Sequence, residues 1–280
     1  MRIDGGGGAN VVQGNYIGTD VDSLPSLGND NGITVTDAPN NLIGGASAGA
    51  RNYILANNSV VHVTNPGSAG TVIQGNVILD NDNGIVLFAT TGITVGGFNS
   101  GNVIGSNTFR GVLVGGTSSA NSIFANSIFN NDALGIDLHA DNENANTVTP
   151  NDVLDNDTGP NELQNYPVIN SIAVSGNERT VEGELSSNPN TDYVLHFYSN
   201  SEVDPSGFGE GQFYLGALNK HSDAQGHLNF GFPLNAAAGG KFITATATDA
   251  SGNTSEFSKA SAAVPAHVFE YFDSRIGSDW

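Results

Sequence analysis

The chain of 280 residues carries 28 acidic residues against 8 lysines and arginines, a formal net charge of −20, and it contains no cysteine. This charge argues against nucleic acid as a partner, because lysine and arginine must neutralise phosphates there, and the lack of cysteine excludes disulfides and thiol catalysis. No apolar run predicts insertion into a membrane, and the length predicts about two domains.

Residues 1–140 repeat a six-residue phrase that starts with Asn or Thr, has Ile or Val in third place and ends in Asn. Short apolar phrases, such as GITV at Gly32 and GIVL at Gly84, lie between the copies. Their alternation and their Gly, Asn, Asp and Ser borders are typical of short strands, which cannot bury their apolar side chains alone. The sequence therefore predicts stacked coils of a parallel β-solenoid. The copies begin at Asn10, Asn52, Thr71, Asn102 and Asn121.

The spacing of these copies and their asparagines carry two further predictions. Asn52 precedes Asn102 by 50 residues, and Thr71 precedes Asn121 by the same interval, so the repeating unit is interpreted as a pair of coils. The asparagines are interpreted as turn residues, since Asn tolerates the left-handed backbone region and its amide bonds nearby main chain. Stacked copies then form asparagine ladders, with sugar binding by these asparagines as the functional alternative.

Residues 141–165 form an acidic, Asp- and Asn-rich linker that is too polar to bury a core. Calcium takes six to eight hard oxygen ligands, and four side chains in this linker offer them at close spacing. The segment is therefore a predicted calcium site. A solvated acidic linker without metal is the alternative, because the full spacing of a helix–loop–helix calcium loop is missing. The four predicted ligands are Asp152, Asp155, Asp157 and Asn161.

Residues 166–262 contain longer alternating runs that predict seven antiparallel strands in a small β-sandwich. The runs are PVINSIAV, RTVEGEL, DYVLHFYS, GQFYLGAL, GHLNFGF, KFITATATD and SEFSKA, and most of their aromatic residues are predicted to face the core. Residues 263–280 fit neither pattern, and the predictions for them are a swapped helix, a cap or foreign sequence.

The phrases VVQGNYIGTD, GITVTDAPNNLIGG and TVIQGNVI resemble those of bacterial right-handed parallel β-helix repeat proteins, in the pectin-lyase-like superfamily. The stretches TPNDVLDNDTGPNELQNYPVI and ITATATDASGNTSEFS resemble the linker and immunoglobulin-like module that commonly follow such helices. This resemblance implies an all-β chain, with a right-handed parallel β-helix followed by an antiparallel immunoglobulin-like β-sandwich. It also implies a secreted or cell-surface location, as a piece of a longer chain. The superfamily holds both enzymes and non-catalytic adhesins.

The candidate catalytic residues are acids beside the repeat. The solenoid has no lysine and only three arginines, and the motifs of polygalacturonases are absent, which argues against a pectinase. Asp30, Asp82 and Asp132 precede equivalent strands, so stacking predicts a row of carboxylates on one face, where repulsion or a bridging cation is expected. Asp137, His139 and Asp141 lie beside the last copy, near the domain junction, where a small groove is expected to hold either a metal or an acid/base pair. Turn-forming aspartates are the alternative interpretation.

The leading functional prediction is a non-catalytic module that binds polysaccharide or a cell-surface glycan. The alternative is a polysaccharide lyase or glycoside hydrolase that works at the Asp-lined face of the solenoid. If the chain is an enzyme, its predicted catalytic residues are Asp82, Asp132, Asp137 and His139.

Overall fold

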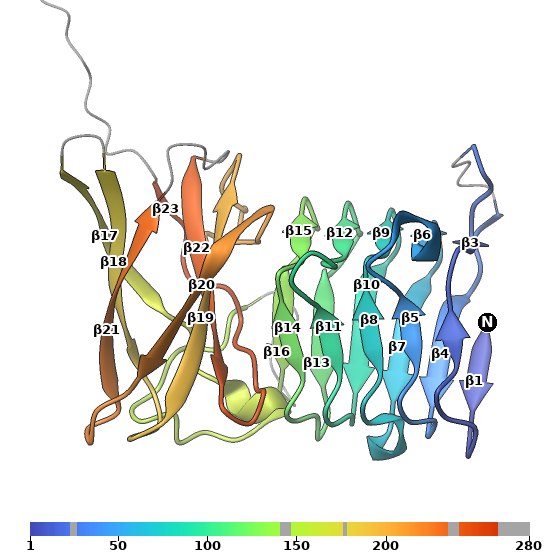
Figure 1. The fold of residues 1–280 in the computed structure, drawn as a ribbon, viewed down its shortest axis with the longest axis horizontal. Helices are drawn as coiled ribbons and strands as arrows, with labels where there is room; N and C mark the ends of the chain where they lie inside the picture. Colours follow the sequence, from blue (N-terminus) through green and yellow to red (C-terminus); the bar gives the residue numbers. More distant parts are fainter. Residues whose placement is uncertain (23–26, 141–146, 176–177, 235–240, 263–280) are drawn as a thin grey trace, which may run out of the picture.

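The computed structural model describes residues 1–22, 27–140, 147–175, 178–234 and 241–262. The chain is all-β: a parallel β-solenoid comes first, and two antiparallel sheets, the sheet pair, lie against its C-terminal end (Figure 1). The predicted parallel β-solenoid is confirmed. The tail at residues 263–280, for which several origins were predicted, lies outside the described residues, as do residues 141–146 of the linker.

Three parallel sheets form the walls of the solenoid. Sheet A consists of β1 (Arg2–Asp4), β4 (Asn31–Thr36), β7 (Ser59–Thr64), β10 (Asn83–Phe88), β13 (Val112–Gly115) and β16 (Ile136–His139). Sheet B consists of β2 (Val11–Val12), β5 (Leu42–Gly44), β8 (Val72–Gln74), β11 (Thr94–Gly96) and β14 (Ser122–Phe124). Sheet C consists of β3 (Tyr16–Ile17), β6 (Tyr53–Leu55), β9 (Val77–Leu79), β12 (Val103–Gly105) and β15 (Ser127–Phe129). The part of the chain that the structure describes also contains the short 3₁₀ helices η2 (Ala48–Ala50), η3 (Pro66–Ser68) and η4 (Pro160–Leu163).

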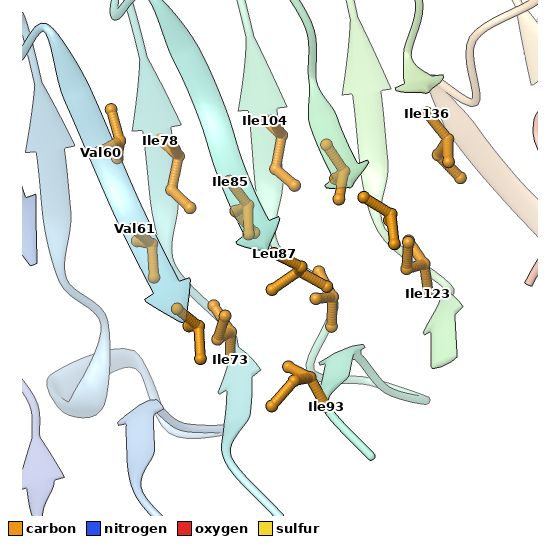
Figure 2. Packing of buried hydrophobic residues seen from close by; sticks show 14 of the residues in the cluster. Val60, Val61, Ile73, Ile78, Ile85, Leu87, Ile93, Ile104, Ile123 and Ile136 are labelled. Carbon is orange, nitrogen blue, oxygen red and sulfur yellow. The ribbon is translucent and has the colours of Figure 1, made fainter. Parts of the chain in front are cut away.

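Apolar side chains fill the interior of the solenoid in stacked columns (Figure 2). In sheet A the inward column contains Val61, Ile85, Val112 and Ile136, which are register partners from coil to coil and are all buried. Each three-residue strand of sheet B or C contributes a central inward residue, such as Ile73. Stacking coils about 4.8 Å apart is what removes these short strands from water.

The five copies of the repeated phrase occupy two different corners of the coil. Those at Asn10, Thr71 and Asn121 lead into sheet B, whereas those at Asn52 and Asn102 lead into sheet C. Equivalent residues of successive coils are 24 to 28 residues apart in one corner, so the 50-residue interval spans two coils. Each coil therefore holds one of these five copies, alternately at the two corners, so two copies at the same corner lie two coils apart.

Buried asparagines form the predicted ladders along these corners. In the ladder between sheets C and A, Asn57 Oδ1 accepts hydrogen bonds from the backbone N–H and from Nδ2 of Asn29, at 3.1 and 2.9 Å. Asn57 in turn donates its N–H and Nδ2 to Oδ1 of Asn81, at 2.8 and 3.3 Å. Each rung therefore accepts from the preceding coil and donates to the next. The full ladder is Asn29, Asn57, Asn81, Asn107 and Asn131.

The prediction that the repeated asparagines take the left-handed backbone region is wrong for these rungs. From Asn57 onward, the left-handed residue is the one before each rung, as at Ala56 (φ 58°), Asp80 (φ 56°) and Ser106 (φ 53°). The chain thus completes its sharp turn one residue earlier, and the rung residue follows with its amide inside the stack. Asparagine is needed here for its hydrogen bonds rather than for its backbone freedom.

The sheet pair contains a three-stranded and a four-stranded antiparallel sheet around one core. The first sheet has β17 (Val168–Ser175), β18 (Glu178–Ser186) and β21 (His227–Leu234). The second has β19 (Asp192–Asn200), β20 (Phe213–His221), β22 (Phe242–Asp249) and β23 (Ser261–Ala262). Phe197, Phe230 and Phe232 pack together in the core as predicted, whereas Phe213 is 43% exposed.

Six of the seven predicted strands of this region form, and the seventh, SEFSKA at residues 255–260, does not. Along this segment the hydroxyls of Ser255 and Ser258 accept hydrogen bonds from the backbone N–H groups of Ala247 and Ala245, at 2.9 and 3.0 Å. For these two N–H groups, serine hydroxyls are the acceptors in place of the backbone carbonyls of a regular β-ladder. The segment is therefore not a regular strand, and Glu256 and Phe257 face the solenoid.

We expect Asn57→Ala to lower the free energy of unfolding by about 2–4 kcal/mol, because the Asn29 N–H and the carbonyl oxygens of Ile17 and Leu55 lose this side-chain partner. Asn58→Ala is the matched control: Asn58 is exposed, and its side chain donates to the exposed Asp30 carboxylate, at 3.3 Å. Its effect should stay within about 0.5 kcal/mol. Urea denaturation measures both variants, and equal losses would contradict the structural role of the ladder.

Candidate functional site at the junction of the solenoid and the sheet pair

The sheet pair and the linker cover the open C-terminal end of the solenoid. Leu163 from the linker, and Tyr198 and Phe257 from the sheet pair, belong to the same apolar cluster as the solenoid interior. Glu256 accepts the backbone N–H of Leu138 at Oε1 and that of Thr149 at Oε2, at 3.1 and 2.8 Å. The last coil is therefore closed by apolar packing together with acceptors for its outward N–H groups.

At two corners of the last coil, asparagine side chains are hydrogen-bonded to residues from outside the solenoid. Asn131 donates its N–H and Nδ2 to Oε1 of Glu210, at 3.1 and 2.7 Å, so Glu210 replaces the next asparagine rung. Asn121 likewise donates its N–H and Nδ2 to Oδ1 of Asn161, at 3.1 and 3.2 Å. Asn161 also donates from Nδ2 to the carbonyl oxygens of Asn121 and Thr254. The sequence grouped Asn161 with the calcium ligands, but in the structure its side-chain amide is hydrogen-bonded to Asn121 and Thr254 at the end of the solenoid.

The other three predicted metal ligands do come together. Asp152, Asp155 and Asp157 each place a carboxylate oxygen within 4.8 Å of the others. Asp155 is buried and accepts hydrogen bonds from the Asn165 N–H and the Ser187 hydroxyl, at 2.9 and 2.6 Å. Burial, with a smaller contribution from repulsion by Asp157 and Asp152, raises the pKa of Asp155 to about 6. Clustered carboxylates fit a hard cation such as Ca²⁺, whose charge would offset this repulsion.

The predicted row of aspartates forms, but its members do not touch. Backbone hydrogen bonds between coils give the order Asp30, Asn58, Asp82, Thr108 and Asp132, so each carboxylate lies two coils from the next. Two coils correspond to about 10 Å. The residues between are neutral, and the Thr108 hydroxyl donates to Oδ1 of Asp82 at 3.1 Å. All three aspartates are exposed, and the intervening side chains separate their charges.

Asp137 and His139 lie on the outward side of β16, where sequence reasoning missed a third residue, Arg110. Asp137 is only 2% exposed and forms a buried ion pair with the Arg110 guanidinium. His139 Nδ1 lies 4.0 Å from Oδ2 of Asp137. Arg110 lies just before β13, which pairs with β16 in sheet A. The parallel pairing of these two strands brings Arg110 close to Asp137. The charge of Arg110 is matched by that of Asp137, and this pairing favours a structural role for the Asp137 carboxylate.

Asp132 opens onto an acidic groove of about 550 Å³ between the last coil and the sheet pair. Glu202, Asp204 and Glu210 from the sheet pair line the same groove, beside the ring of Phe129. Burial raises the pKa of Glu210 to about 7, although the hydrogen bonds from Asn131 act in the opposite direction. Glu210 was not predicted from the sequence, since a single acid in a glycine-rich loop has no local pattern that marks it.

The chain matches no protein-family model, and no curated protein has significant sequence similarity to it. Within the described residues, no helix is long and apolar enough to span a membrane.

Glu210 predicts a dependence of stability on pH. Because folding raises its pKa, its protonated form favours the native state, and this contribution disappears as the pH rises through about 7. Glu210→Gln keeps an oxygen acceptor for Asn131 and removes the buried charge. As the pH rises from mildly acidic to mildly alkaline, we expect the stability of the variant to fall less than that of the wild type. Thermal unfolding across that range tests this, and parallel curves would contradict it.

The aspartate cluster predicts stabilisation by calcium. Millimolar Ca²⁺ should raise the Tm of the wild type by a few degrees, since a ligand that binds only the native state stabilises it. Asp157→Asn should abolish this rise, whereas Asp82→Asn, which changes an exposed acid outside the cluster, should keep it. Calorimetry with Ca²⁺ or a chelator measures the shift. An equal rise in both variants would place calcium elsewhere.

Proposed function

We propose that this chain is a non-catalytic module of a secreted or surface-attached bacterial protein, which binds polysaccharide or a cell-surface glycan. The solenoid is the rigid scaffold, and the sheet pair is an immunoglobulin-like cap and spacer. The phrases that resemble pectin-lyase-like β-helix proteins support this placement, as does the succession of parallel and antiparallel sheets.

One observation carries the non-catalytic part of the proposal: the predicted catalytic residues do not converge on one space. Asp82 and Asp132 lie about 10 Å apart on an exposed edge, with Thr108 between them. Asp137 is buried and paired with Arg110. General acid/base catalysis requires a matched pair of groups that face one substrate position. These residues instead belong to a surface that hydrogen bonds and the Arg110–Asp137 ion pair hold in place.

A glycoside hydrolase is the second candidate, because Asp132 and Glu210 line one groove. Burial raises the pKa of Glu210 to about 7, a value suited to a general acid, while Asp132 is exposed and suited to a general base. Against this role, Oε1 of Glu210 accepts two hydrogen bonds from Asn131 as the last rung of a ladder.

The two candidates differ in turnover. We expect the protein to bind at least one polysaccharide of a broad panel, measured by affinity electrophoresis. It should release neither reducing ends nor unsaturated uronates, with or without calcium. Turnover that Asp132→Asn or Glu210→Gln abolishes would overturn the non-catalytic proposal, provided that calorimetry shows both variants folded. Absence of binding to the whole panel would overturn the glycan-binding proposal.

A further inference from the structure

A second hollow, of about 460 Å³, lies at the start of β15 (Ser127–Phe129), whereas the acidic groove lies at the end of the same strand. It is formed by the corner between sheets B and C in the last coils and by β20 of the sheet pair. Phe98 and Tyr214 line it together with polar side chains that include Asn99 and Ser127. Among the described residues that line this hollow there is no carboxylate, lysine or arginine.

Phe98 is the most unusual side chain of the hollow, because it is 61% exposed although three rings surround it. Its ring centroid lies 5.5 Å from that of Phe124, 6.1 Å from that of Tyr214 and 6.4 Å from that of His196. It follows Gly96 and Gly97, whose backbone angles (φ 98° and 148°) disfavour other residues and fix the turn that carries it. The ring is thus held in place and still open to solvent.

The rings that pack behind Phe98 are held by contacts with one another and carry no charge. His196 is 3% exposed, stacks on Phe124 at 5.3 Å and shares a hydrogen bond of 3.2 Å between Nδ1 and the Tyr214 hydroxyl. Burial lowers the pKa of His196 to about 4 and raises the pKa of Tyr214 to about 12. Both groups are therefore neutral at physiological pH.

The charge of the chain restricts what this hollow can bind. The net charge of −20 repels polyanions such as polyuronates. Among the solenoid arginines, Arg110 is paired with Asp137, and Arg51 donates from Nε to the Gly75 carbonyl. A ligand without charge avoids this repulsion. Pyranose rings present apolar C–H faces that pack on aromatic rings and hydroxyls that bond to amides and hydroxyls, which is the lining found here.

We propose that the hollow beside Phe98 and Tyr214 binds a neutral glycan chain, with pyranose rings packed against Phe98. This inference rests on the proposed glycan-binding function and specifies both the place and the class of ligand. Because Phe98 belongs to the solenoid and Tyr214 to the sheet pair, the site exists only while the two parts are docked.

The test compares neutral and acidic polysaccharides on matched variants. Soluble β-glucan, mannan and polygalacturonate are the probes, in affinity electrophoresis followed by titration calorimetry. We expect the wild type to bind a neutral probe and not polygalacturonate. Phe98→Ala should weaken that binding by about tenfold, as expected for loss of one ring platform, with an unchanged Tm. Phe109→Ala is the control, since Phe109 is a similarly exposed phenylalanine (47%) outside the hollow.

The possible outcomes distinguish failure of the inferred site from failure of the proposed glycan-binding function. Neutral-glycan binding that Phe98→Ala leaves intact overturns the site and retains the module as a glycan binder. Binding of polygalacturonate alone overturns the inferred ligand class. Binding of no probe by the wild type overturns the inference, whereas the broad panel of polysaccharides decides the proposed function.

Discussion

The structure depends on the hydrogen bonds of buried asparagine side chains at the corners of the coils. Where the chain leaves one sheet and enters the next, backbone groups lose their regular partners, and an unmet buried group costs about 1–3 kcal/mol. Asparagine offers both an acceptor and a donor in one short side chain. In the ladder that contains Asn57, the asparagine accepts hydrogen bonds from the preceding coil and donates hydrogen bonds to the next coil. These hydrogen bonds between asparagines therefore run in one direction along the stack.

That direction explains the chemistry of the junction. The last coil ends in N–H groups that need acceptors, and the linker and sheet pair supply oxygens: Glu210 for Asn131, Asn161 for Asn121 and Glu256 for Leu138. A carboxylate accepts such bonds strongly, but burying it carries a desolvation cost, which the raised pKa of Glu210 reflects. The sheet pair is therefore a cap that completes the solenoid with its own side chains.

The same stacking decides where ligands can bind. Within the solenoid, register holds Asp82 and Asp132 two coils apart, and short side chains on a flat edge cannot close that gap. Side chains converge instead where the solenoid meets other parts of the chain. Asp132 and Glu210 share the acidic groove, whereas Phe98 and Tyr214 line the uncharged hollow. Both spaces have walls from the solenoid and from the sheet pair, so both exist only while the two parts are docked.

The sequence by itself determined the solenoid, its asparagine ladders and six strands of the sheet pair, because alternation and period are local patterns along the chain. It also marked Asp152, Asp155 and Asp157, which are close in sequence and remain close in space. Only the tertiary structure decided that Asn161 accepts the Asn121 N–H, that Arg110 pairs with Asp137, and that Glu210 and Tyr214 face the solenoid. These contacts join residues from different coils or domains, and such pairings depend on stacking register and docking, which no local pattern encodes.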